Sequence, residues 1–99
     1  MSAAIRQVTI RGRVQGVGYR AWVAHSAVSH DLEGWVRNRG DGSVEAFFAG
    51  PADVVAEMVK RCGRGPSSSR VDQVTEAPCS DGTLNLRRAG ERFSVLPTL

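Results

Sequence analysis

The hydrophobic residues near the N-terminus follow the pattern of a β-strand. Every second residue from 8 to 14 is Val, Ile or Gly, and the residues between them are Thr or Arg. A period of two predicts a strand with one buried face. From Arg20 to His30 the apolar residues recur at helical spacing, which predicts a helix over that range. Asp31 follows, a residue type that tolerates the left-handed conformation at which such a helix can end.

A hairpin of two strands is predicted in the middle of the chain. Residues 32–38 form its first strand, and Val44, Ala46 and Phe48 alternate with other residues along the second. Arg39 to Gly42 lies between them and contains Asp-Gly, which supplies the positive φ angles of tight hairpin turns. We therefore expect these two strands to be antiparallel neighbours.

The second half of the chain predicts another helix and further strands. Gly50-Pro51 ends the returning strand, and proline suits the first turn of a helix. Apolar residues at i, i+3, i+4 and i+7 between Val55 and Cys62 predict an amphipathic helix there. A strand is expected from Val71 to Thr75, or two residues further. A turn at Asp81-Gly82 and a short strand from Phe93 to Leu96 complete the prediction.

These elements define the expected fold. Their order is strand, helix, strand, strand, helix, strand, with a short tail strand, which is the ferredoxin-like split βαβ arrangement (βαββαβ) of the α+β class. We expect an antiparallel sheet of four to five strands with both helices on one face. A length of 99 residues fits a single domain spanning 1–99. Two right-handed crossovers would bring the first loop beside the middle strands.

The composition is that of an ordinary globular protein with a small positive charge. Hydrophobic residues make up 41% of the chain and charged residues 23%, the formal net charge is +3, and arginine supplies 12 of the 13 basic residues. A charge of this size favours small anions over nucleic acid as binding partners. No apolar run reaches membrane-spanning length and no signal peptide begins the chain, so we expect a cytoplasmic protein.

The cysteines and histidines suggest no separate chemistry. Cys62 falls on the apolar stripe of the second helix, and its spacing from Cys79 is not that of metal ligands. We expect Cys62 in the core and no disulfide in the cytosol. His25 and His30 have no carboxylate partner at a suitable spacing, so neither is assigned a catalytic role, and His30 is expected to be partly buried.

The glycine-rich loop between the first strand and the first helix is the main candidate for chemistry. Gly16 and Gly18 allow successive N–H groups to point the same way, as in an anion nest, with the positive end of the helix behind them. Arg20 in the first helical turn would add a planar, permanently charged group. Without further support, however, such a loop is more often a plain tight turn than a phosphate site.

Two segments resemble the motifs of a known family, the acylphosphatases. Residues 12–20, Gly-Arg-Val-Gln-Gly-Val-Gly-Tyr-Arg, resemble its first motif. Residues 34–38, Gly-Trp-Val-Arg-Asn, followed by Asp-Gly-Ser-Val-Glu at 41–45, resemble its second. The two motifs occur in the expected order with one predicted helix between them. Tyr19 stands where phenylalanine is common, which keeps an aromatic ring, and the segment from Cys79 to Arg92 is the least similar.

The resemblance implies hydrolysis of small-molecule acyl phosphates to a carboxylate and inorganic phosphate, without a metal or other cofactor. By motif position, Arg20 and the loop amides would bind the phosphate, and Asn38 would hold the attacking water. The loop residues concerned are Gln15, Gly16, Val17, Gly18, Tyr19 and Arg20. We expect a monomer that binds neither nucleic acid nor membrane.

The residue types agree with what this reaction needs. The departing carboxylate is a weak base, so a general acid is dispensable. Phosphoryl transfer depends mainly on positioning and on stabilising charge on the equatorial oxygens, which backbone amides and a guanidinium can do. A neutral amide at Asn38 can accept a hydrogen bond from water, whereas an aspartate there would repel the phosphate.

Two other functions fit parts of the chain. Residues 16–21 match the Gly-x-Gly-x-x-Ala form of the dinucleotide fingerprint, but a hairpin follows where that fold needs a parallel βαβ unit. A ferredoxin-like nucleic-acid or ligand-binding module without catalysis, including a carbamoyl-phosphate-handling domain, is the alternative to an enzyme. An RNA-binding sheet would need spaced aromatic residues, whereas Phe47 and Phe48 are adjacent and so point to opposite faces.

The remaining aromatic and basic residues of the motifs are assigned structural roles. Trp22 and Trp35 are expected to pack, and Tyr19 is expected to anchor the loop to the core. Arg37 and Arg39 are expected to be solvated, and Arg37 has the further option of attracting the anion.

Overall fold

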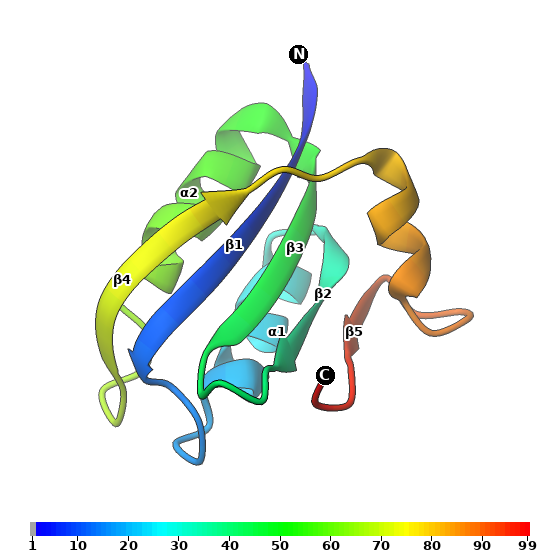
Figure 1. Ribbon diagram of the computed structural model, residues 1–99. Coiled ribbons are helices and arrows are strands. Elements are labelled where there is room, and N and C mark those ends of the chain that lie inside the picture. Colours follow the sequence, from blue (N-terminus) through cyan, green and yellow to red (C-terminus); the bar gives the residue numbers. More distant parts are fainter. Residues whose placement is uncertain (1) are drawn as a thin grey trace.

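The computed structural model describes residues 2–99 and contains one sheet with two α-helices on one face (Figure 1). In chain order the elements are β1 (Ala3–Arg13), α1 (Tyr19–Ser29), β2 (Glu33–Asn38), β3 (Val44–Pro51), α2 (Ala52–Cys62), β4 (Arg70–Ala77), the 3-10 helix η1 (Asp81–Leu86) and β5 (Phe93–Val95). The predicted βαββαβ order is confirmed. No helix within residues 2–99 is long and apolar enough to cross a membrane.

The five strands are arranged in the order β4-β1-β3-β2-β5. β1 pairs with β3 and β4, and β2 pairs with β3, all antiparallel, as predicted. β5 instead pairs in parallel with β2, so the sheet is mixed rather than entirely antiparallel. β3 also continues through Gly50-Pro51, where the sequence predicted its end, because Pro51 is opposite Ala3 at the edge of the β1–β3 ladder.

The main core lies between the sheet and the two helices. Alternate residues of the central strands, among them Val8, Val36 and Phe48, are buried against apolar residues of α1 and α2. Cys62 belongs to this core, as predicted, and both cysteines are free thiols. Asp31 has a φ of +57°, which confirms that the chain turns through the left-handed region after α1.

A second, smaller core covers part of the opposite sheet face. Trp35 and Phe47 stack there with ring centroids 6.0 Å apart. η1 lies over them, and Trp35 Nε1 donates a hydrogen bond to the carbonyl oxygen of Thr83 at 2.9 Å. The sequence predicted only a turn at Asp81-Gly82, because a short 3-10 helix held by distant contacts has no periodic pattern of its own. Trp35 is fully buried, as expected of a packing residue.

Candidate active site

The loop between β1 and α1 contains two glycines in left-handed conformations and a set of free backbone donors. Gly16 and Gly18 have φ angles of +74° and +80°, which favour glycine. Gly18 is the N-cap of α1, no side chain caps this helix, and its first turn contains no acidic residue. Within residues 2–99, the N–H groups of Gly16, Val17 and Gly18 donate to no protein acceptor. This end of α1 therefore has free donors and a positive potential.

Two hydrogen bonds anchor this loop to α2 and to the segment that follows it. The hydroxyl of Tyr19, a fully buried residue, donates to the carbonyl oxygen of Cys62 at 2.6 Å, which confirms its predicted anchoring role. Burial raises the pKa of Tyr19 well above its ordinary value, so the phenol keeps the proton that it donates. Ser68 Oγ donates to the carbonyl oxygen of Val17 at 2.8 Å, a contact that the sequence did not predict for this serine-rich turn.

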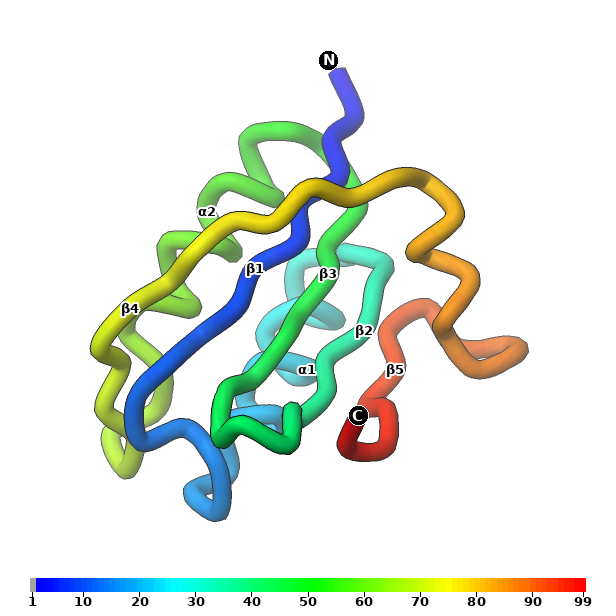
Figure 2. Tube along the Cα trace, in the orientation of Figure 1, coloured from blue at the N-terminus to red at the C-terminus, as the bar shows by residue number. Residues whose placement is uncertain are grey.

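A cavity of about 240 Å³ opens beside the loop. Its lining residues come from the β1–α1 loop, α1, β2 and β5: Val14, Gly16, Gly18, Tyr19, Arg20, Ala21, Asn38 and Val95. Figure 2 shows that the β1–α1 loop and the β2–β3 turn lie at the same end of the sheet. The structure thus places Arg20 and Asn38 on one cavity, although 17 residues separate them in the chain. None of the lining residues is acidic, and Arg20 forms no ion pair within residues 2–99.

Asn38 occupies the last position of β2, and its backbone is held on both sides. It is opposite Val44 in the β2–β3 ladder, and its carbonyl oxygen accepts a hydrogen bond from the N–H of Leu99 at 3.0 Å. Its side-chain oxygen Oδ1 is buried and has no hydrogen-bond partner within residues 2–99. A buried polar atom without a partner is costly. Because Asn38 also lines the cavity, its side chain is a candidate for contact with a ligand or water.

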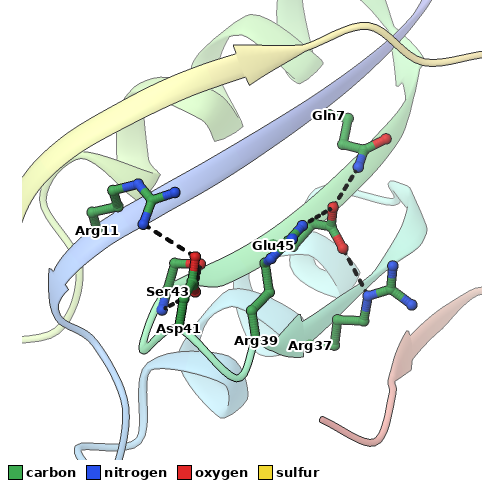
Figure 3. Close-up of polar contacts among 7 residues, drawn as sticks. All are labelled: Gln7, Arg11, Arg37, Arg39, Asp41, Ser43 and Glu45. Carbon is green, nitrogen blue, oxygen red and sulfur yellow. Dashed lines mark hydrogen bonds and ion pairs between the residues drawn. The ribbon is translucent and has the colours of Figure 1, made fainter. Parts of the chain in front are cut away.

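The other face of the same hairpin carries a fully paired cluster (Figure 3). The carboxylate of Glu45, only 5% exposed, accepts hydrogen bonds from Arg37 Nε at 2.7 Å and Arg39 Nη1 at 3.1 Å. Gln7 Nε2 also donates to it at 2.7 Å. The guanidinium carbon Cζ of Arg37 lies over the ring of Trp35, 4.8 Å from the ring centroid. The expectation of a solvated Arg37 is therefore wrong, because a buried carboxylate and an aromatic ring hold its guanidinium.

The β2–β3 turn is closed by Asp41. Its Oδ1 accepts hydrogen bonds from the N–H and hydroxyl of Ser43, and its Oδ2 accepts one from Arg11 Nη1 at 3.2 Å (Figure 3). Hydrogen bonds from Ser43, with a smaller contribution from Arg11, lower the pKa of Asp41 to about 2. The predicted Asp-Gly turn is present, and Gly42 has a φ of +92°.

Not every predicted loop residue lines the cavity. Val17 does not line it, and Gln15 directs its side-chain amide to the β2–β3 turn instead. Three apolar lining residues, Val14, Ala21 and Val95, were not predicted. Val95 could not be found from local sequence, because only the pairing of β5 with β2 brings it to the site.

The histidines and the second tryptophan agree with the structural roles assigned to them. His30 is half-buried, and its Nδ1 lies 2.7 Å from the carbonyl oxygen of Ser26. Trp22 is partly buried beside Tyr19, with ring centroids 5.8 Å apart. Burial raises the pKa of the Cys62 thiol to about 12, which keeps it neutral and unreactive. None of these side chains lines the cavity except that of Tyr19.

Fold and site together define a small ferredoxin-like protein with a cavity beside the N-terminus of α1 and one arginine in its lining. The family model of acylphosphatase matches residues 6–89. An acylphosphatase of Rhodopseudomonas palustris (strain BisB18) is 67% identical over 99 residues, covering 100% of both chains. The structure of an acylphosphatase from Coxiella burnetii matches with a TM-score of 0.78 and 29% identity over 95% of this chain and 93% of that one.

A second solved structure gives the same result. The acylphosphatase from Bacillus subtilis matches with a TM-score of 0.76 and 33% identity, over 96% of this chain and 99% of that one. The chain belongs to the acylphosphatase family, which confirms the resemblance of its two motifs.

Proposed function

We propose that the chain hydrolyses acyl phosphates in the cavity between the β1–α1 loop and the end of β2. The substrate is a small-molecule acyl phosphate, and the products are a carboxylate and inorganic phosphate. The N–H groups of residues 15–20 and the guanidinium of Arg20 bind the phosphoryl group. Asn38 orients the attacking water.

The loop suits the phosphoryl group because its donors are fixed before the substrate arrives. Its N–H groups and the start of α1 stabilise negative charge on the equatorial oxygens without reorganisation during the reaction. Arg20 adds two parallel N–H donors, a geometry that matches two phosphoryl oxygens. The absence of acidic lining residues leaves this positive potential undiminished.

The unpartnered Oδ1 of Asn38 is the observation that supports the proposal most strongly. A water molecule that donates a hydrogen bond to this oxygen would have its lone pair free for attack on phosphorus. The side-chain amide is neutral, so it does not repel the phosphoryl group. The ladder with Val44 and the hydrogen bond from Leu99 hold the backbone of Asn38 and thereby fix the position of this water.

The reaction is expected to need no metal ion, because the leaving carboxylate is already a weak base and because the loop and Arg20 supply the charge stabilisation. The test is hydrolysis of benzoyl phosphate by the purified chain with and without EDTA. We expect equal turnover in both conditions. Turnover that EDTA abolishes would overturn metal independence, and no turnover in either condition would overturn the proposed activity.

The non-catalytic alternative is disfavoured by the sheet face on which it would depend. The aromatic residues that could stack bases, Trp35 and Phe47, are buried under η1.

We propose that residues 1–99 act as one monomeric, cytoplasmic domain. Size-exclusion chromatography with light scattering should give a mass near 10.6 kDa, and a dimer mass would overturn the monomer.

A further inference from the structure

The side chain of Gln15 connects the two halves of the site. Its Nε2 donates hydrogen bonds to the carbonyl oxygens of Arg39 and Ser43, each at 2.8 Å. These two carbonyls flank the β2–β3 turn, and Arg39 directly follows Asn38. Both N–H donors of one neutral amide are therefore used to join the phosphate loop to the hairpin that presents the water-binding residue.

This connection lies where the backbone offers none. The β1–β3 ladder ends at the pair Ile10 and Val44, so the chain beyond that pair leaves the hairpin. The other two hydrogen bonds that anchor the loop are donated by Tyr19 to Cys62 of α2 and by Ser68, in the turn after α2, to Val17. Only the Gln15 side chain joins the loop itself to the strand end that carries Asn38, among the hydrogen bonds found in residues 2–99.

We propose that Gln15 is a positioning residue that fixes the separation between the phosphate loop and Asn38. This inference rests on the proposed function, in which the loop holds the phosphoryl group and Asn38 holds the water. In-line attack requires both to be placed together, and an error of about 1 Å in such a geometry can cost about a hundredfold in rate. The side chain of Gln15 thus acts through the relative placement of the two groups, whereas its backbone N–H belongs to the phosphate-binding loop.

The residue type fits this role. A glutamine can donate to two carbonyl oxygens at once, whereas a glutamate of the same length would direct its own oxygens at them. A methionine has a similar length but no donor. The substitution Gln15→Met therefore removes both hydrogen bonds while leaving the loop glycines and Arg20 unchanged.

The first measurement separates rate from phosphate binding. For Gln15→Met we expect kcat on benzoyl phosphate to fall roughly 10- to 100-fold. The inhibition constant for inorganic phosphate should change by less than about threefold, because the phosphate-binding donors remain. An unchanged kcat, or an equal loss of phosphate binding, would overturn the proposal. If Gln15→Met does not fold, Gln15→Asn, which is too short to reach both carbonyls, should give the same result.

The matched control is Ser68→Ala. It removes one side-chain hydrogen bond to the same loop, but on the side facing away from Asn38. We expect its kcat to change by less than about threefold, as for a loss that leaves the reacting groups in place. A loss equal to that of Gln15→Met would show that any weakening of the loop has this effect, and would overturn a specific role for Gln15.

The second measurement repeats the substitution in the Asn38→Ala background. If Gln15 acts through Asn38, Gln15→Met should reduce kcat by less than about twofold in that background. A full additional loss there would overturn the proposal. The Asn38→Ala variant separates the proposed role of Asn38 from that of Gln15. If its kcat equals that of the native chain, the role of Asn38 is overturned. If its kcat is low but the Gln15→Met single variant keeps the native kcat, only the role of Gln15 is overturned.

Discussion

The two faces of the β2–β3 hairpin carry polar groups in opposite states. On the helix face, the Oδ1 of Asn38 is buried and has no hydrogen-bond partner in residues 2–99. On the other face, the carboxylate of Glu45 accepts hydrogen bonds from Arg37, Arg39 and Gln7. Neighbouring residues of a strand point to opposite faces of the sheet, so groups that are close in sequence lie in different surroundings. The paired carboxylate stabilises the fold, whereas the unpaired oxygen of Asn38 belongs to a residue that lines the cavity.

The N-termini of the two helices differ in the same way. α2 follows Pro51 and carries Asp53 in its first turn, so a negative charge compensates the helix dipole. α1, whose N-cap is Gly18, has no acidic residue in its first turn, and neither helix has a side-chain cap. No acidic residue therefore compensates the positive end of α1, as the proposed phosphate site requires. In the hairpin and at the helix N-termini alike, polar groups that are paired within the fold are thus separated from polar groups near the cavity that are not.

The largest expected effect is on activity, at Arg20 in the lining of the cavity. Arg20→Lys should lower kcat/KM on benzoyl phosphate about a thousandfold, because one ammonium cannot replace two parallel donors aimed at the phosphoryl oxygens. Steady-state kinetics measures the loss, and circular dichroism should show an unchanged fold. Near-normal turnover would mean that the backbone amides alone bind the phosphoryl group.

Asn38→Ala should lower kcat about a hundredfold, as expected for the loss of one preorganised polar contact, with a much smaller change in KM. Its free energy of unfolding should not fall and should rise by up to about 1 kcal/mol, because the variant removes a buried oxygen that has no partner in the fold. Urea denaturation provides this value. A rise in KM with kcat intact would show that Asn38 binds substrate and does not orient water.

Glu45→Gln should give the opposite result on the other face of the hairpin. The variant leaves two half-buried arginines without their counter-charge, so the free energy of unfolding should fall by about 2 kcal/mol. At a temperature where the variant is folded, kcat should stay within about threefold of the native value. A hundredfold loss of kcat in a folded variant would show that the two faces are not separate in function.

The sequence was sufficient for the features that depend on local pattern. Alternation in β1 and helical spacing in α2 located those elements, and the glycines with Arg20 indicated an anion site. The role of Asn38, in contrast, came from the resemblance of the two motifs, because an asparagine before an Arg-Gly-Asp-Gly turn is by itself an ordinary turn residue. The family comparison confirms that resemblance, and the catalytic roles stay proposals.

The features that could not be predicted all depend on contacts between distant residues. Trp35 and Thr83 are 48 residues apart, Ser68 and Val17 are 51 apart, and Gln15 reaches across 24 residues to Arg39. A single side chain bonded to a distant backbone carbonyl leaves no periodic signal along the chain. Arg37 is a different kind of error: it was expected to be solvated, although the predicted hairpin already placed it close to Glu45, its partner in the β2–β3 ladder.

The smallest expected effect is on the pH dependence of stability, at the exposed turn between the two faces. The pKa of Asp41 is lowered to about 2, so its contribution to stability is complete above the ordinary carboxyl pKa, near pH 4, and disappears as the pH falls towards 2. The difference in unfolding free energy between the native chain and Asp41→Ala should therefore shrink over this range in urea denaturation. Asp41→Asn, which keeps an acceptor for Ser43 at every pH, is the control and should be less sensitive to pH than the native chain. An Asp41→Ala difference that is constant from pH 4 to pH 2 would show that the hydrogen bonds from Ser43 do not depend on the charge of Asp41.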